Sequence, residues 1–284
     1  MNDVIISITT IPVRKELLKR TLPYLLKQNY FAKLIINLDN NLTEEDYKFY
    51  ETEIASQDKR IEIYKECESK WRSCNKLLPT IKRYPDDIII TLDDDLGYGS
   101  DIVKCLLEGY IKFPNCIISH EVNPLKITDD NYIQYLNDFA IKIGQLDYSK
   151  YMSNACLFPP HTFDGTDIFN YDKMMALTNG THDELWFWVN STLKGIKVHC
   201  LNYSYSLHLD SEIQHQESDY QLTNENCLPE RIKEYNKKLN ELYGNELKYV
   251  FNNSDIVLII FLMISNFNTK LPLPMALITF VFAI

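Results

Sequence analysis

The sequence lacks any pairing pattern among its cysteines. Its seven cysteines occur singly, and none lies in a Cys-x-x-Cys pair. Such spacings fit neither a zinc site nor a disulfide framework. Scattered single cysteines are typical of small core residues in a reducing compartment. We therefore expect a cytoplasmic protein.

The sequence also lacks an excess of positive charge. It has 29 Lys and Arg residues against 39 Asp and Glu residues, which gives a formal net charge of -10. This charge argues against a nucleic-acid partner, because a phosphate backbone requires a basic surface. A nucleotide diphosphate is not excluded, since a metal ion and one or two basic side chains can meet its charge locally.

No internal repeat occurs at a fixed period. The N-terminus shows no basic segment followed by an apolar run, so we expect no signal peptide. The 284 residues are 45% hydrophobic and 24% charged, which is ordinary for a globular protein. A chain of this length can bury a sizeable core in one large domain or two small ones.

Apolar runs and helical periodicity alternate along the first two hundred residues. Strands are predicted at 4–8, 34–38, 61–64, 88–92, 116–118 and 196–201, and helices at 18–28, from 43, at 73–83, 101–112, 182–194 and 229–242. Thr181 is the expected N-cap of the helix at 182–194, and Gly195 follows its end. Residues 121–180 are predicted to be long loops with short elements. The alternation indicates an α/β fold with a doubly wound, mostly parallel sheet flanked by helices.

The last stretch has a different composition. Residues 256–284 contain one charged residue, Lys270, and two apolar runs that Pro272 and Pro274 separate. Each run is shorter than the roughly 20 residues that a membrane-spanning helix needs. Two interpretations stay open: a buried terminal element, or a tail that contacts the inner face of the membrane.

Three consecutive carboxylates follow the most apolar predicted strand. Ligands of doubly wound sheets bind at the carboxyl ends of the strands, where Asp93, Asp94 and Asp95 stand. Side chains alternate along an extended backbone, so Asp93 and Asp95 are expected to lean to the same side. Two such carboxylates suit Mg²⁺ or Mn²⁺, which could bridge the phosphates of a nucleotide. The alternative is a solvated turn or a helix cap.

Two acids and two tryptophans stand at the start of the helix predicted at 182–194. Asp183 and Glu184 open a helix, where they could serve as a general base or interact with the helix dipole. Trp186 and Trp188 follow them, and could stack on a sugar ring or pack in the core.

Basic residues and one more carboxylate accompany the other strands. Arg14 and Lys76 could meet a diphosphate or be surface charges. Asp39 could accept hydrogen bonds from a ribose or base. Thr9 begins the loop after the first strand, and that loop contains no glycine before Arg14, which counts against the phosphate loop of a nucleotidyltransferase.

The order of these segments resembles a known family. The segments are Ser7–Arg14, Leu25–Gln28, Lys76–Pro79, Tyr84–Asp95, Leu157–Pro160 and Asp183–Trp186. They resemble bacterial glycosyltransferases of the GT-A fold that build capsular or surface polysaccharide. The resemblance covers roughly residues 4 to 226, and its most specific part is Tyr84–Asp95. The chain has Asp-Glu where the family's acid pair is usually Asp-Asp or Glu-Asp.

The resemblance implies a function and a division of the chain. It implies a nucleotide-sugar donor, Mn²⁺ or Mg²⁺ at Asp93 and Asp95, and a base at Glu184 or Asp183. Residues 1–120 would bind the donor, 121–250 a glycan or lipid-linked acceptor, and 251–284 would be an apolar tail. We expect Thr9, Arg14, Asp39, Lys76 and Asp94 to assist the nucleotide. The alternatives are a sugar- or nucleotide-binding protein without turnover, and a nucleotidyltransferase.

Overall fold

The structure is a computed structural model that describes residues 2–127, 133–135, 150–201 and 229–267. It divides into two compact units, Met1–Gly244 and Asn245–Ile284. The first unit holds the sheet and every residue predicted to act. The division of that unit at residue 120 stays a prediction.

The elements alternate as the sequence predicts. The strands are β1 (Val4–Thr9), β2 (Lys33–Asp39), β3 (Ile61–Cys67), β4 (Ile88–Thr91), β5 (Cys116–Ile127), β6 (Ile133–Tyr135), β7 (Lys150–Phe158) and β8 (Lys197–Cys200). The α-helices are α1 (Lys15–Leu26), α2 (Glu44–Phe49), α3 (Leu78–Arg83), α4 (Ile102–Lys112), α5 (Tyr171–Thr178), α6 (Asp183–Leu193) and α8 (Pro229–Phe267). Short helical turns are η1 (Pro12–Arg14), η2 (Tyr50–Ile54), η3 (Ala55–Gln57) and η4 (Ser69–Lys76).

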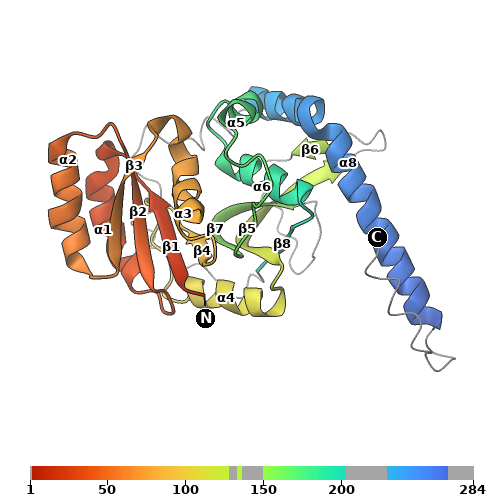
Figure 1. Ribbon diagram of the computed structural model, residues 1–284, viewed down its shortest axis with the longest axis horizontal. Helices are drawn as coiled ribbons and strands as arrows, with labels where there is room; N and C mark the ends of the chain where they lie inside the picture. The colour runs from red at the N-terminus through yellow and green to blue at the C-terminus, as the bar shows by residue number, and fades with distance from the viewer. Residues whose placement is uncertain (1, 128–132, 136–149, 202–228, 268–284) are drawn as a thin grey trace. The chain divides into compact units, whose positions relative to one another are not determined.

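The strands form one sheet in the order β3-β2-β1-β4-β7-β5-β6, with β8 beside β5 (Figure 1). The ladders β3–β2, β2–β1, β1–β4 and β5–β8 are parallel, and β4–β7, β7–β5 and β5–β6 are antiparallel. The predicted α/β class with a mostly parallel sheet is therefore confirmed. In the parallel half, the carboxyl ends of β1, β2, β3 and β4 meet at one edge.

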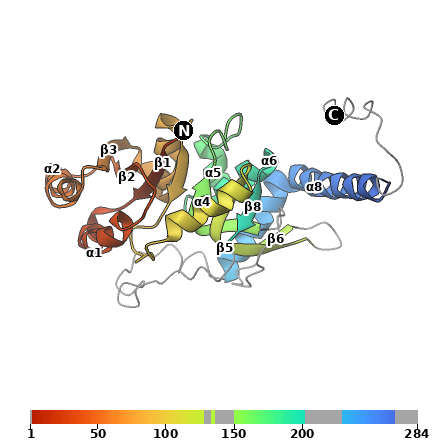
Figure 2. The same cartoon turned by 90° about the horizontal axis from the view of Figure 1, so that it is seen from below.

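Helices cover both faces of the parallel half of the sheet. Its strands are therefore buried on both sides, and their sequences are continuous apolar runs. Ile6 and Ile8 of β1 belong to one buried cluster with Leu18 and Leu22 of α1. The alternate residue Ser7 points to the opposite face and contacts Thr80 of α3. Figure 2 shows the same arrangement from below.

Several boundaries differ from the sequence prediction. The segment 121–180 was expected to be mainly loops, but it contains the end of β5, the nine-residue strand β7 and helix α5. The helix predicted at 73–83 is two elements, and Lys76 ends η4 rather than opening α3. His182, not Thr181, is the N-cap of α6, because the Thr181 hydroxyl instead donates to the Thr178 carbonyl.

The C-terminal part of the chain is helical. The helix predicted at 229–242 is the first part of α8, and the boundary between the two units falls within α8. In the described part of the chain, no helix is both long enough and apolar enough to cross a membrane. Residues 268–284, which include the second apolar run, lie outside the described residues.

Candidate functional site

The predicted site residues come from the carboxyl ends of neighbouring strands. Thr9 ends β1, Asp39 ends β2, and Asp93 lies two residues beyond β4. The antiparallel strand β7 passes beside β4, with Cys156 opposite Thr91. The acid pair enters from the first turn of α6, so residues distant in sequence meet at one edge of the sheet.

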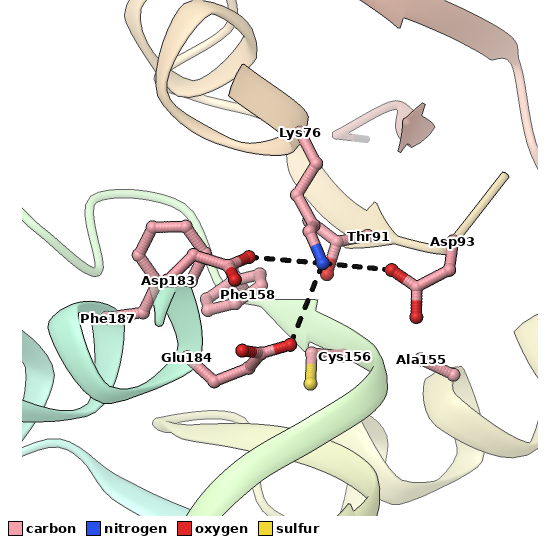
Figure 3. Close-up of a pocket in the computed structure, with 9 residues that line it drawn as sticks. All are labelled: Lys76, Thr91, Asp93, Ala155, Cys156, Phe158, Asp183, Glu184 and Phe187. Carbon is pink, nitrogen blue, oxygen red and sulfur yellow. Dashed lines mark hydrogen bonds and ion pairs between the residues drawn. The ribbon is translucent and has the colours of Figure 1, made fainter. Parts of the chain in front are cut away.

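The Lys76 side chain lies at the centre of this site. Its Nζ atom is 2.9 Å from Asp93 Oδ1, 3.1 Å from Asp183 Oδ2 and 3.7 Å from Glu184 Oε1 (Figure 3). Only 13% of the Lys76 side chain is exposed. One ammonium therefore joins the aspartate run to the acid pair. The sequence placed Lys76 near a diphosphate but did not predict these three contacts.

The other two aspartates face Arg14. Its guanidinium lies 2.9 Å from Asp94 Oδ1 and 3.5 Å from Asp95 Oδ2. Asp95 shares this cation with Asp94, while Asp93 contacts Lys76, and a common side for Asp93 and Asp95 stays a prediction. The alternation rule requires an extended backbone, and the chain turns at Asp94 and Asp95.

Charge and burial shift the pKa values of the acids. Burial raises the pKa of Asp94 to about 6, although Arg14 opposes the shift. Burial and the neighbouring Glu184 charge likewise raise the pKa of Asp183 to about 6, against the effect of Lys76. Burial also opposes ionisation of Glu184, but Lys76 and His182 outweigh it, so the pKa of Glu184 is lowered. The acid pair thus contains one carboxylate that is ionised throughout the neutral range and one that titrates near pH 6.

A small cavity opens between the two groups of acids. Thr91, Cys156, Phe158 and Phe187 line it, together with Lys76 and the acids that contact it. Its free volume is about 10 Å³, room for about one water molecule. The ammonium of Lys76 fills the space between Asp93 and the acid pair, so a substrate group that enters there would have to move this side chain.

A buried network of polar side chains contacts the backbone of Lys76. Ser7 Oγ donates to the Lys76 carbonyl at 2.7 Å and lies 2.6 Å from Thr80 Oγ1. Asn37 Nδ2 donates to Ser7 Oγ at 3.0 Å and to Thr80 Oγ1 at 3.1 Å. Nothing in the sequence indicated this network. It fixes the backbone of Lys76 because all of its members are buried and hydrogen-bonded.

Two further residues that the sequence did not indicate hold the carboxylates. The buried Tyr98 hydroxyl accepts a hydrogen bond from the Asp93 backbone N–H at 2.9 Å. Asn75 Nδ2 donates to Asp39 Oδ1 at 2.9 Å. Burial raises the pKa of Asp39, and the Asn75 hydrogen bond opposes the rise. Thr9 contributes its hydroxyl to the Asn37 carbonyl at 2.9 Å.

Other candidate residues serve the core. Trp186 and Trp188 are fully buried, and Trp186 Nε1 donates to the Ile168 carbonyl at 2.9 Å. Core packing, the commoner fate of tryptophan, is therefore confirmed over stacking on a sugar. His120 and His199 are also buried.

The chemistry of the site fits a divalent cation. Within the described ranges, no three His, Cys, Asp or Glu side chains form a ready metal cage. Mg²⁺ is commonly held by one or two carboxylates together with substrate phosphates and water. Asp93 and Asp95 offer the hard oxygen donors that such ions prefer. Five carboxylates also face the two cations Arg14 and Lys76, so the surplus of negative charge favours another cation.

Comparisons with known proteins give distant likenesses. No family model matches the chain, and no curated protein matches its sequence. A 4-diphosphocytidyl-2C-methyl-D-erythritol synthase structure is similar at 11% identity and a TM-score of 0.42, covering 75% of this chain and 95% of that one. The same synthase from Anaerococcus prevotii DSM 20548 gives 14% identity, a TM-score of 0.46, and coverage of 75% and 92%.

A third similar structure is the mannosyltransferase PcManGT from Pyrobaculum calidifontis, solved in complex with GDP-Man and Mn²⁺. It has 13% identity and a TM-score of 0.35, and the match covers 41% of this chain and 34% of that one. Likenesses this distant carry no inference about the activity of this chain.

Proposed function

We propose that the chain is a metal-dependent glycosyltransferase that moves a sugar from a nucleotide-sugar donor to a glycan or lipid-linked acceptor. The observation that supports this proposal is the meeting of the aspartate run and the acid pair on Lys76. Such a reaction needs positive charge at the leaving diphosphate and a carboxylate at the attacking hydroxyl. Both kinds of group lie around one small cavity.

On the donor side, Asp93 and Asp95 would hold Mg²⁺ or Mn²⁺. The ion would supply charge stabilisation to the leaving diphosphate. Arg14 and Lys76 would add to that stabilisation, since both side chains lie at the same strand edge. Asp94 would keep Arg14 in place.

The nucleoside part of the donor would lie over the neighbouring strands. Asp39, at the end of β2, would accept hydrogen bonds from the ribose or base, and its position is fixed by Asn75. Thr9 would lie beside it at the end of β1.

On the acceptor side, the acid pair supplies the base. Glu184 has 25% of its side chain exposed against 5% for Asp183, so Glu184 is the more accessible of the two acids to an acceptor hydroxyl. The acceptor oxygen would attack the anomeric carbon as its proton passes to the carboxylate. The bond from that carbon to the diphosphate oxygen would break, and its electron pair would leave with the nucleoside diphosphate. A single displacement of this kind inverts the anomeric centre.

The acid pair also separates this proposal from its alternatives. Carboxylates at strand ends would equally suit a nucleotidyltransferase, which binds a metal-bridged triphosphate. That reaction leaves no clear task for a second pair of acids beside the first. A protein that only binds sugars would not need a base in a buried, polar cavity.

Variants at the two acids and at one metal ligand test the proposal. Each protein is incubated with a panel of nucleotide sugars and Mn²⁺, with and without oligosaccharide acceptors, and released nucleotide is measured. We expect Asp95→Asn to abolish release, and Glu184→Gln to lower kcat by about 10²- to 10⁴-fold, the usual contribution of a general base. Glu45→Gln, an exposed acid in the first turn of α2, should retain wild-type activity. Full activity in Asp95→Asn would refute the metal site, and full activity in both Glu184→Gln and Asp183→Asn would refute the base.

A further inference from the structure

A second cavity lies at the opposite end of β4 from the aspartate run. It has a volume of about 270 Å³ and lies between the end of α3 and the segment that follows β7. Three aromatic residues line it, Tyr84, Phe163 and Phe169, together with Asp87 and Asp164. Ligand pockets in proteins begin at about 300 Å³. The cavity therefore suits a single ring better than a whole nucleotide.

Several contacts join the two segments that line this cavity. His161 lies 3.0 Å from Asp86 through Nε2 and 2.9 Å from Asp164 through Nδ1. Its backbone N–H donates to the Pro85 carbonyl at 3.3 Å. Thr162 and Thr166 close the turns of the same segment with hydroxyl bonds to backbone carbonyls. These contacts join the segment after β7 to the turn before β4.

The second cavity shares a sheet face with the catalytic one. Ile89 lines the second cavity and Thr91 the first, and residues two apart on a strand point to the same face. Ile89 and Thr91 are about 7 Å apart along the strand. Phe158 and Phe187 of the first cavity pack against Phe163 of the second, with ring centroids 5.7 and 6.3 Å from it. One layer of aromatic rings therefore divides the two cavities.

The lining indicates the chemistry of a ligand. Among the described residues that line the cavity, the basic group is His161, which contacts Asp86 and Asp164. The carboxylates of Asp87 and Asp164 would repel a phosphate. Carboxylates accept strong hydrogen bonds from hydroxyl groups. Phe169 lines the cavity with 50% of its surface exposed, which offers an apolar platform at the rim. Aromatic rings together with carboxylates that accept hydrogen bonds from hydroxyl groups suit an uncharged, polyhydroxylated ring as the ligand.

We propose that this cavity binds one sugar residue of the acceptor glycan, other than the residue whose hydroxyl reacts. Naming the sugar as part of the acceptor rests on the proposed glycosyl transfer, whereas the capacity to bind an uncharged saccharide does not. Anchoring one residue of the glycan there would hold the chain on the protein while another residue presents its hydroxyl to the acid pair. It would also make the protein prefer an acceptor longer than one sugar.

Saccharide binding by the full chain tests this site without nucleotide or metal. The protein is applied to an array of uncharged oligosaccharides and of sugar phosphates, and hits are measured by titration calorimetry. We expect an uncharged oligosaccharide to bind, and Phe169→Ala to weaken its binding by about tenfold through loss of the ring contact. Phe169→Tyr keeps the ring and should bind within about threefold of the wild type. Ile111→Ala, an exposed apolar residue on α4, is the matched control and should change nothing.

The outcomes separate this site from the proposed activity. Binding that Phe169→Ala weakens, in a protein that releases nucleotide from no donor, would support the site and refute the activity. Nucleotide release with no saccharide binding, or with binding that Phe169→Ala leaves unchanged, would refute the site alone. Preference for sugar phosphates would also refute it. In an active protein, Phe169→Ala should raise KM for an oligosaccharide acceptor about tenfold and leave kcat unchanged.

Discussion

Replacing Lys76 by methionine keeps the buried aliphatic stem and removes the ammonium that Asp93, Asp183 and Glu184 share. Breaking a buried ion pair by removing one partner typically costs about 3 to 5 kcal/mol, because the remaining charge is left without compensation. With 13% of the Lys76 side chain exposed, solvent screens these contacts only weakly. We expect Lys76→Met to lower the free energy of unfolding at pH 7.5 by about that amount.

The loss should depend on pH in a defined direction. In the wild type, Lys76 lowers the pKa of both acids, which leaves Asp183 at about 6 and Glu184 below its usual range. Without the ammonium both folded-state pKa values rise. A carboxylate with a raised folded pKa binds its proton more tightly when folded, so the fold loses stability as the pH rises through that range. The difference between wild type and Lys76→Met should therefore be smaller near pH 4.5 and grow toward pH 7.5.

Urea unfolding followed by circular dichroism at several pH values measures both effects. Lys104→Met is the matched control, because Lys104 makes an exposed pair with Glu108 at 3.8 Å on one helix. Such surface pairs contribute only about 0.3 to 0.5 kcal/mol. A Lys76→Met protein as stable as this control, or one whose loss is the same at pH 4.5 and 7.5, would refute the reasoning.

Three further predictions concern residues around the site. Burial raises the pKa of Asp94 to about 6, so the wild type loses stability as that group ionises. Asp94→Asn should therefore flatten the pH dependence of the free energy of unfolding between about pH 4 and pH 6. An unchanged pH profile in urea unfolding would contradict this. Tyr98→Phe removes the acceptor of the Asp93 backbone N–H, so we expect a loss of about 1 kcal/mol by thermal unfolding and a lower nucleotide release rate. Gly109→Val should cost about 1 to 3 kcal/mol or more in a urea melt, since a Cβ atom there would lie 2.8 Å from Ile118 Cγ2; wild-type stability would show that α4 and β5 can separate.

The parts of the fold that the sequence predicted share one property. Strands β1, β2 and β4 are buried on both faces, so their sequences are continuous apolar runs with clear ends. Strand β7 was missed because its residues, Lys150–Phe158, mix polar and apolar types without a clear period. Its conformation depends on pairing with β4 and β5, which sequence periodicity cannot show.

The site was predictable as a set of residues and not as an arrangement. Asp93, Asp94 and Asp95 were conspicuous because three acids follow an apolar strand. Their orientation could not be predicted from the sequence, because the alternation rule assumes an extended chain and the backbone turns there. The contacts of Lys76 with two separate acidic segments are tertiary, and they depend on how η4 and α6 pack against the sheet.

Glycosyl transfer itself is tested most directly by identifying the products. The wild-type protein is incubated with Mg²⁺ and either nucleotide sugars with oligosaccharide acceptors, or nucleoside triphosphates with sugar phosphates, and followed by ³¹P NMR and mass spectrometry. The account predicts a nucleoside diphosphate, an acceptor heavier by one sugar, and loss of both on adding a chelator. Pyrophosphate formed from the triphosphate mixture, with no heavier acceptor in the other, would contradict it and identify a nucleotidyltransferase.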